Sequence, residues 1–297
     1  MADKRGPSSS ARRSTIRSAL HSVLATLLAG TITYLGVCGL ALGVYSAVFP
    51  PVTGVQLQRQ IEGFWTDASL PQRYDPVPLR DIADALPQAV VAAEDSRFFE
   101  HRGIDWSMVQ EALEEYQNGE DLRGASTITQ QLVKNLFLTT HSTLVRKALE
   151  VPLTYAAEFI LSKRRILELY LNVVEWGPGV YGAAEAAAYH YGQSPASLTR
   201  AQSAALAACL PNPRVRRPQT MGWYQRIILR RMSTLGPLPL STLRAPSTQR
   251  VLSHAPTPTS LYSLPPHPAF PHDRPPERHG HHPLRRHASG HRRGRGW

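Results

Sequence analysis

The chain has 297 residues, 42% of them hydrophobic, and a formal net charge of +11, which allows one or two domains with a substantial apolar core. The excess charge lies at the ends: residues 1–17 carry five basic side chains against one acid, and residues 244–297 carry nine arginines against two acids. The part between them holds 19 basic and 19 acidic side chains, which argues against a nucleic acid partner for the body.

Residues 22–49 contain no charged side chain. As a helix this run would be about 42 Å long, against a hydrocarbon core of roughly 30 Å. It is longer than the apolar region of a secretory signal, and no cleavage site of small residues follows it. We therefore expect a transmembrane helix over 20–49 after a basic cytoplasmic segment, 1–19. The basic cluster before the helix predicts a single pass, with the rest of the chain across the membrane.

Residues 50–86 are rich in proline, so we expect an irregular juxtamembrane connector there. Beyond it, apolar side chains at helical spacing predict helices over about 87–99, 106–117, 128–137, 143–161, 163–174, 200–210 and 221–234. Their starts are marked by Pro87, Asp105, Ser126 or Thr127, Ser142, Ser162, and Thr199 with Gln202. No segment alternates with period two, so we predict an all-α body over about 75–235.

The last segment, 236–297, contains 12 prolines and eight of the 12 histidines, with no apolar period. This composition is typical of a disordered tail. Its arginines favour an anionic lipid or polymer as partner. Metal binding is the weaker alternative, because the histidines are irregularly spaced among the arginines.

The most informative stretch is Val90–Gly103, VVAAEDSRFFEHRG. On a helix, Val90, Val91 and Glu94 share one face, because residues three and four apart are neighbours. Glu94 therefore ends an apolar stripe, where the loss of water raises the pKa of a carboxyl toward neutral pH. This makes Glu94 a candidate acid or base. The alternative is a helix end with two ordinary surface acids.

Two further segments are rich in groups that bind anions. In GASTITQQLVKN, residues 124–135, hydroxyls and amides stand where a core helix would carry aliphatic side chains, and Lys134 follows. Beside a helix N-terminus such groups suit an anion or a sugar; an exposed capped helix is the alternative. In RKALE, Arg146 and Lys147 share a helix face with Glu150. Two cations beside a carboxylate suit a negatively charged leaving group, whereas a plain surface ion pair would contribute little.

These stretches are part of a larger pattern. The motifs EDSRFFEHRG, GASTITQQLVKN, RKALE, KRRILELYLNVVEWGPGVYGAAEAA and AACLPNP occur in this order. Together they resemble the five-motif signature of the peptidoglycan glycosyltransferases over about 75–235, and most closely that of the monofunctional biosynthetic transglycosylases. Bifunctional penicillin-binding proteins continue into a transpeptidase domain, but no SxxK or KTG motif follows here.

The resemblance implies a lysozyme-like fold with a head and a membrane-facing jaw, behind an anchor in the bacterial inner membrane, with the catalytic domain in the periplasm. The implied substrates are lipid II and the nascent glycan chain. The implied reaction is an inverting transfer to the acceptor 4-hydroxyl that releases undecaprenyl diphosphate during cell wall synthesis. Membrane lipid is an implied partner, and cell-division or elongation proteins are further candidates.

By the same resemblance, Glu94 is the general base, and Glu150 positions or stabilises the departing diphosphate. Lys134, Arg146 and Lys147 contact its phosphates. The implied cleft-lining and site-shaping residues are Ser126, Thr127, Gln131, Asp95, Phe98 and His101. No cofactor is required and no metal ligand set is present; the family leaves open Mg²⁺ or Mn²⁺ beside the diphosphate. By analogy with inverting hydrolases, we predict at least about 6.5 Å between the two glutamate carboxyls.

One departure from the family pattern and two other functions remain open. Pro152 follows Glu150 by two residues, and proline inside a helix removes a hydrogen bond, so either a kink or an altered Glu150 geometry is expected. A lytic transglycosylase or lysozyme-like enzyme would share the fold but cleave glycan. A non-catalytic envelope scaffold would use only the anchor and the tail.

Overall fold

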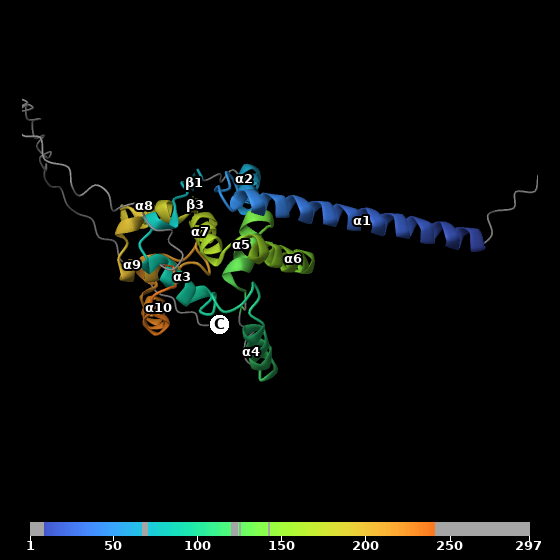
Figure 1. Ribbon diagram of the computed structural model, residues 1–297. Coiled ribbons are helices and arrows are strands. Elements are labelled where there is room, and N and C mark those ends of the chain that lie inside the picture. The colour runs from blue at the N-terminus through green and yellow to red at the C-terminus, as the bar shows by residue number, and fades with distance from the viewer. Residues whose placement is uncertain (1–8, 67–70, 120–123, 125, 142, 241–297) are drawn as a thin grey trace, which may run out of the picture. The chain divides into compact units, whose positions relative to one another are not determined.

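Figure 1 shows the computed structural model, which describes residues 9–66, 71–119, 124, 126–141 and 143–240, with side chains from Arg17 onward. Contacts divide the chain into two units, Met1–Ala245 and Pro246–Trp297, and all the described residues belong to the first. Most of the predicted tail, and the start of the predicted cytoplasmic segment, therefore lie outside the described residues.

Helix α1 (Ser9–Tyr45) is long and apolar enough to cross a membrane. Its side chains are exposed over residues 17–33, whereas Cys38 and Leu42 are buried against the body. The Tyr34 hydroxyl donates to the carbonyl oxygen of Phe137 at 2.6 Å. Figure 1 shows α1 leaving the body beside α2 and running alongside α6, against which it packs. The C-terminal turns of α1 are therefore part of the packed body.

The prediction of an irregular connector is wrong for Gly54–Thr66, which forms helix α2. The polar side chains of α2 face inward: Gln58 is buried and donates to the Thr140 hydroxyl at 2.8 Å, and Arg59 Nε lies 3.6 Å from the Glu175 carboxylate. The large exposed side chains are apolar, namely Leu57, Ile61, Phe64 and Trp65, and Gln60 is the polar exception on this face. The helix is thus amphipathic with its polar face buried, a pattern that a search for a buried apolar stripe misses.

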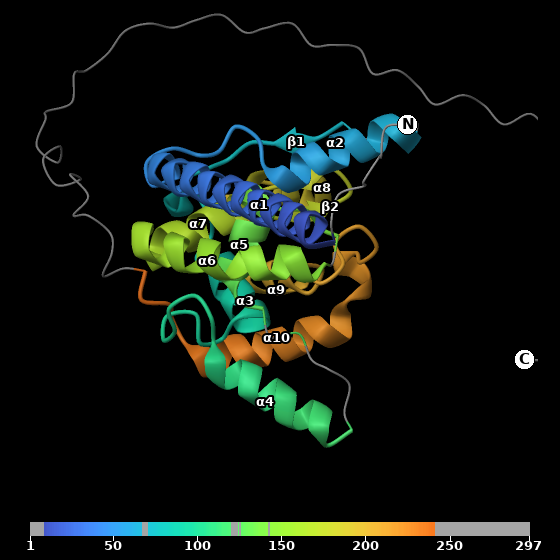
Figure 2. The same cartoon turned by 90° about the vertical axis from the view of Figure 1, so that its right-hand side faces the viewer.

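The remaining helices of the described chain are α3 (Ala85–Glu94), α4 (Trp106–Gln117), α5 (Ile128–Phe137), α6 (Leu144–Ile160), α7 (Lys163–Val173), α8 (Ala183–Tyr191), α9 (Arg200–Ala207) and α10 (Gly222–Leu235). Short 3₁₀ turns η1 (Leu79–Asp81), η2 (Pro195–Ser197) and η3 (Pro218–Thr220) connect some of them. Helix α3 packs against α9 and α10, and α5 packs against α6 and α7 (Figures 1 and 2). The all-α prediction is confirmed.

Most helix starts follow the predicted caps. Asp105 accepts from the Met108 N–H, Ser162 caps α7, and Thr127 and Thr199 each form a capping box. The start of α6 differs, because Thr143 caps it and Ser142 lies outside the described residues. Caps are local in sequence, which is why the sequence predicts them.

The predicted helix over 87–99 ends early. Helix α3 stops at Glu94, and Asp95 leaves the helical conformation with φ −162°. Phe98 turns into the core, where it is fully buried, so burial of its ring outweighs continuation of the helix. The result places Glu94 in the last turn of α3, at the point where the chain bends away.

Proline at position 152 does not interrupt helix α6, which is continuous from Leu144 to Ile160. Pro152 cannot donate to the carbonyl of Ala148 one turn back. The Thr154 hydroxyl donates to the Glu150 carbonyl at 2.6 Å. This hydrogen bond joins residues on either side of Pro152 and helps to keep the helix continuous. Glu150 itself is buried.

A small sheet lies beside the helices, with strand order β1 (Arg73–Tyr74), β3 (Val180–Tyr181), β2 (Glu175–Gly177). Strands β1 and β3 are parallel, and β2 is antiparallel to β3. Strands of two or three residues are too short to show a period in the sequence. Strands β2 and β3 connect α7 to α8. Gly182, directly before α8, bonds to the residue that follows α7 and so holds the two helix ends together.

Gly182→Ala is expected to lower the free energy of unfolding by about 2 kcal/mol or more. Gly182 has φ +88°, and an added Cβ would lie 2.8 Å from the backbone carbonyl oxygen of Asn172. Gly192→Ala is the matched control, because its φ is +65° but no atom lies within 4 Å of the added carbon, leaving only about 1–2 kcal/mol of backbone strain. Denaturant unfolding measures both; equal losses would contradict the predicted steric clash.

Candidate active site

The Glu94 carboxylate lies at the C-terminal end of α3 and faces α5. Its Oε2 accepts a hydrogen bond from Gln131 Nε2 at 2.8 Å. Burial raises the pKa of Glu94 above its ordinary value, and the charge of Asp95 adds to this effect. The hydrogen bond from Gln131 and the positive charges of Lys134 and Arg216 act in the opposite direction. Glu94 is thus a desolvated carboxylate with oriented donors, as a general base requires.

The Gln131 amide is itself oriented by a third residue. The buried Tyr170 hydroxyl, on α7, donates to Gln131 Oε1 at 2.8 Å. Since that oxygen is occupied, the amide NH₂ faces Glu94 and not the reverse. Tyr170, Gln131 and Glu94 therefore form a hydrogen-bond chain across three helices, and Tyr170 acts on Glu94 only through Gln131.

Tyr170→Phe is expected to move the acid limb of the pH–rate profile to higher pH. Without the hydroxyl, the Gln131 amide can turn its oxygen toward Glu94, which removes the hydrogen bond that holds the Glu94 pKa down. Log kcat/KM against pH, measured for wild type and variant, tests this. A uniform fall in rate at every pH, with no displacement of the limb, would show a merely structural role. Tyr189→Phe, at an exposed position of α8, is the control.

Lys134, also on α5, interacts electrostatically with Glu94 and with Arg146. Burial lowers the pKa of its ammonium group, the charge of Arg146 lowers it further, and the charge of Glu94 raises it. The charge of Lys134 therefore acts on the candidate base, Glu94, and on Arg146 and Lys147 of α6. The sequence prediction that Glu94 and the RKALE motif share one site is supported by this arrangement.

The first turns of α6 form the second charged group. Glu150 is 2% exposed and forms ion pairs with both Arg146 and Lys147. Lys147 Nζ lies 2.9 Å from Glu150 Oε2 and also donates to Ser126 Oγ at 3.2 Å. Burial lowers the pKa of Lys147, as do the charges of Arg146 and Lys134. One carboxylate thus holds two cations in place, as an anion site needs.

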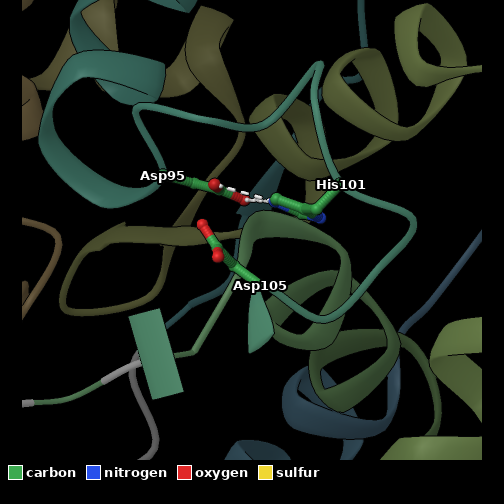
Figure 3. A group of neighbouring side chains, drawn as sticks. All are labelled: Asp95, His101 and Asp105. Carbon is green, nitrogen blue, oxygen red and sulfur yellow. Dashed lines mark hydrogen bonds and ion pairs between the residues drawn. The ribbon is translucent and has the colours of Figure 1, made fainter. Parts of the chain in front are cut away.

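Asp95, directly after α3, bonds to His101 (Figure 3) and to the start of α5. His101 Nδ1 accepts from the Gly103 N–H at 3.1 Å, so its proton is on Nε2, which donates to Asp95 at 2.9 Å. Asp95 Oδ2 also accepts from the Ile128 N–H, the first residue of α5, at 3.0 Å. This contact fixes the separation of the two helices that hold Glu94 and Gln131.

Asp95, His101 and Asp105 place ligand-type atoms within 4.8 Å of one another. Their hydrogen bonds do not fit a resident cation. Asp105 accepts from Arg97 at 2.9 Å, from Ser107 and from the Met108 N–H, and Asp95 is bonded as described above. A metal ion would have to displace the Arg97 guanidinium and a helix cap, so this cluster is better explained as a structural brace.

A cavity of about 520 Å³ opens beside Glu94. Of the predicted site residues, Glu94, Asp95, Ser126 and Thr127 line it, and Lys147 reaches it through its contact with Ser126. Phe98 does not line it: its ring is fully buried, with the Lys163 ammonium 4.4 Å from the ring centroid. Phe98 and His101 therefore do not line the cavity and affect its shape only through the residues that do.

The cavity also has a wall that the sequence prediction missed. The last turns of α10 contribute Arg230, Arg231 and Thr234, and α4 contributes Met108 and Glu111. The spacing of residues 221–234 predicts an amphipathic helix but not where that helix packs. Tyr170 likewise lies in the predicted helix over 163–174, but the sequence does not place it in the site. In both cases the missing information is a tertiary contact between distant segments.

Comparisons with known proteins agree with the motif pattern. The family model described as Transglycosylase matches residues 63–235. The "Biosynthetic peptidoglycan transglycosylase" of Rhodopseudomonas palustris (strain TIE-1) is 51% identical over 147 residues, which is 49% of this chain and 62% of the relative. The protein of the same name from strain HaA2 is 53% identical over 148 residues, 49% of this chain and 65% of the relative.

A longer alignment is found with the protein of that name from Caulobacter vibrioides, 41% identical over 201 residues, 68% of this chain and 82% of the relative. The chain spans less than two thirds of the length of the two Rhodopseudomonas relatives. The resemblance predicted from the five motifs is confirmed, and because the family model covers more than half of its residues, the chain belongs to the transglycosylase family.

Proposed function

We propose that this protein is a peptidoglycan glycosyltransferase that polymerises lipid II into glycan strands. The observation that supports this most directly is the pairing of a desolvated carboxylate, Glu94, with a nearby cluster of three cations, Lys134, Arg146 and Lys147. A sugar hydroxyl needs a base, and a diphosphate leaving group needs positive charge more than it needs a proton.

The proposed reaction begins with the acceptor sugar beside Glu94. The carboxylate takes the proton from the 4-hydroxyl as that oxygen attacks the anomeric carbon of the growing chain. The bond from that carbon to the diphosphate oxygen breaks, and its electron pair leaves with undecaprenyl diphosphate. Attack from the side opposite the leaving group inverts the anomeric centre. The predicted carboxyl separation of at least about 6.5 Å between Glu94 and Glu150 leaves room for this geometry.

The cations are proposed to receive the charge that develops on the diphosphate. Arg146 can give a bidentate contact to phosphate oxygens, whereas Lys134 and Lys147 act as point charges. Glu150 keeps Arg146 and Lys147 in position and limits their mutual repulsion. These three side chains supply the positive charge that Mg²⁺ or Mn²⁺ would otherwise provide, so we propose that no cofactor is required. Measuring lipid II polymerisation with and without EDTA tests this.

We further propose that α1 anchors the protein in the bacterial inner membrane with a cytoplasmic N-terminus and a periplasmic catalytic body. The basic residues before the uncharged run support this orientation, and the exposed apolar side chains of α1 support contact with lipid. Lipid II and the nascent chain are the proposed substrates. Cell-division or elongation proteins remain predicted partners.

The test is incubation of the purified full-length protein, in detergent or in vesicles, with labelled lipid II. We expect high-molecular-weight product that muramidase digests to disaccharide units. A lytic transglycosylase would instead release soluble fragments from cell-wall sacculi, and a scaffold would do neither. Lack of polymer with wild-type protein that remains folded and membrane-bound would overturn the proposal.

A further inference from the structure

A second cavity, of about 580 Å³, lies at the opposite end of α3 from Glu94. The first residues of α3, the end of α10 and the segment 236–240 line it. Arg80 of η1, Arg164 of α7 and Arg200 of α9 also line it, so arginines from three different elements share one cavity. We call it the arginine pocket. The proposed glycosyl transfer makes no use of it.

The charge of the arginine pocket is largely uncompensated. Arg200 donates to Gln88 Oε1 at 3.0 Å and to Ser233 Oγ at 3.1 Å, which are neutral acceptors. In the described part of the chain neither Arg200 nor Arg164 forms an ion pair, and Arg80 lies 3.8 Å from Asp81 with both side chains more than half exposed. Asp84 is the one carboxylate among the lining residues. Positioned guanidinium groups without carboxylate partners are typical of sites for carboxylates or phosphates.

Side chains of the pocket also bond to the backbone of its own wall, at the end of α10 and in the turn that follows. Gln88 Nε2 donates to the carbonyl oxygens of Met232 and Gly236, at 3.1 Å and 2.5 Å. Arg164 Nη1 donates to the carbonyl of Leu240 at 3.4 Å. Apolar side chains from the same lining, Leu79, Met232, Leu238 and Leu240, supply hydrophobic surface. These hydrogen bonds hold the wall together, and the lining offers arginine side chains and apolar surface to a ligand.

We propose that the arginine pocket binds an acidic, partly apolar peptide segment of a partner protein. Carboxylates of the segment would pair with Arg80, Arg164 and Arg200, and its apolar side chains would lie on the hydrophobic surface. The chain's own C-terminal residues do not fit, because 244–297 contain nine arginines against two acids. The apolar lining, Leu79, Met232, Leu238 and Leu240, favours a peptide with apolar side chains over a lipid headgroup.

The probe is a fluorescently labelled hexapeptide of alternating glutamate and leucine, titrated by anisotropy against the full chain in detergent. The matched peptide with glutamine in place of glutamate is the ligand control. Arg164→Gln/Arg200→Gln is expected to weaken binding about ten-fold or more, through loss of two charge-assisted contacts. Arg73→Gln/Arg226→Gln removes the same charge from exposed positions outside the pocket and is expected to leave binding within about two-fold.

Arg80→Gln guards against a folding defect, because this side chain is 71% exposed; it is expected to weaken binding about three-fold or more. A photo-reactive group on the peptide should label residues 232–240. Equal losses in pocket and control variants, or labelling elsewhere, would overturn the proposal. Pocket-dependent binding to vesicles of anionic lipid without peptide binding would overturn it in favour of lipid. None of these measurements depends on glycosyl transfer. Their results therefore test the peptide site separately from the proposed function.

Discussion

Glu94→Gln is expected to lower the rate of lipid II polymerisation by at least about 10²–10⁴-fold, the usual contribution of a positioned base. The glutamine amide keeps the size of the side chain but cannot accept the proton of the 4-hydroxyl. Gel separation of labelled glycan strands, with single-turnover rates, measures the effect. Glu100→Gln, an exposed change in the loop that follows α3, is the control and should polymerise normally. Near-normal turnover of the Glu94 variant would refute the assignment of the base.

The same substitution should leave the fold intact and even stabilise it at neutral pH. Because the pKa of Glu94 is raised in the folded state, the native protein binds this proton more tightly than the unfolded chain. Stability therefore falls as pH rises from the unfolded pKa through the raised folded pKa, and the cost remains above it. Glutamine does not ionise, so the difference in Tm between variant and wild type should grow across that window. A lower Tm at pH 7 would show that the lost activity reflects misfolding.

The raised pKa of Glu94 also determines the pH dependence of catalysis. Only the ionised carboxylate can take a proton, so kcat/KM should rise with pH through the pKa of Glu94 in the free enzyme. That limb should lie above the ordinary range of a glutamate, because burial is the largest effect on this group. A limb at the ordinary glutamate pKa would show that the base is solvated.

Glu150→Gln is expected to lower polymerisation by roughly 10²-fold and also to destabilise the protein. Glu150 is buried between Arg146 and Lys147, so its loss leaves two cations facing each other without a counter-charge. The destabilisation should be up to about 3 kcal/mol, the lower end for a broken buried pair, because Lys147 is 46% exposed and partly solvated.

A double variant separates the two effects of Glu150. Adding Lys147→Met to Glu150→Gln removes one of the opposed cations, so stability should recover by a measurable part while activity stays low. Unfolding in urea and lipid II turnover, measured on the wild type, Glu150→Gln and the double variant, give the comparison. If activity recovered together with stability, Glu150 would be a purely structural residue and the proposed diphosphate site would be wrong.

The sequence predicts the helical body well, because its signals are local. Asp105, Ser162 and Thr199 cap the helices that they were expected to cap. The failures have a common cause in tertiary packing. Helix α2 buries Gln58 and exposes Phe64, which reverses the usual pattern, and α3 ends at Glu94 because Phe98 is drawn into the core.

The candidate site shows the same division. The segments 90–103, 124–135 and 146–150 could be assigned to one site because, in this order, they resemble the motifs of one enzyme family. The orientation of the Gln131 amide could not be predicted from the sequence, because it depends on the Tyr170 hydroxyl of another helix. The place of Arg230 in the cavity wall could not be predicted either. It depends on contacts between α10 and segments more than a hundred residues earlier in the chain.

The docking of α1 has a practical consequence for studies of the isolated enzyme. A shortened protein that began at Ser46 would lose Cys38 and Leu42 from the core, the hydrogen bond from Tyr34, and the stacking of Tyr45 on Phe137 with ring centroids 6.3 Å apart. The uncovered groove would be apolar and would promote self-association. Removing the helix to gain solubility should therefore yield an aggregating preparation, and solubilisation with the helix retained is the better route to crystals.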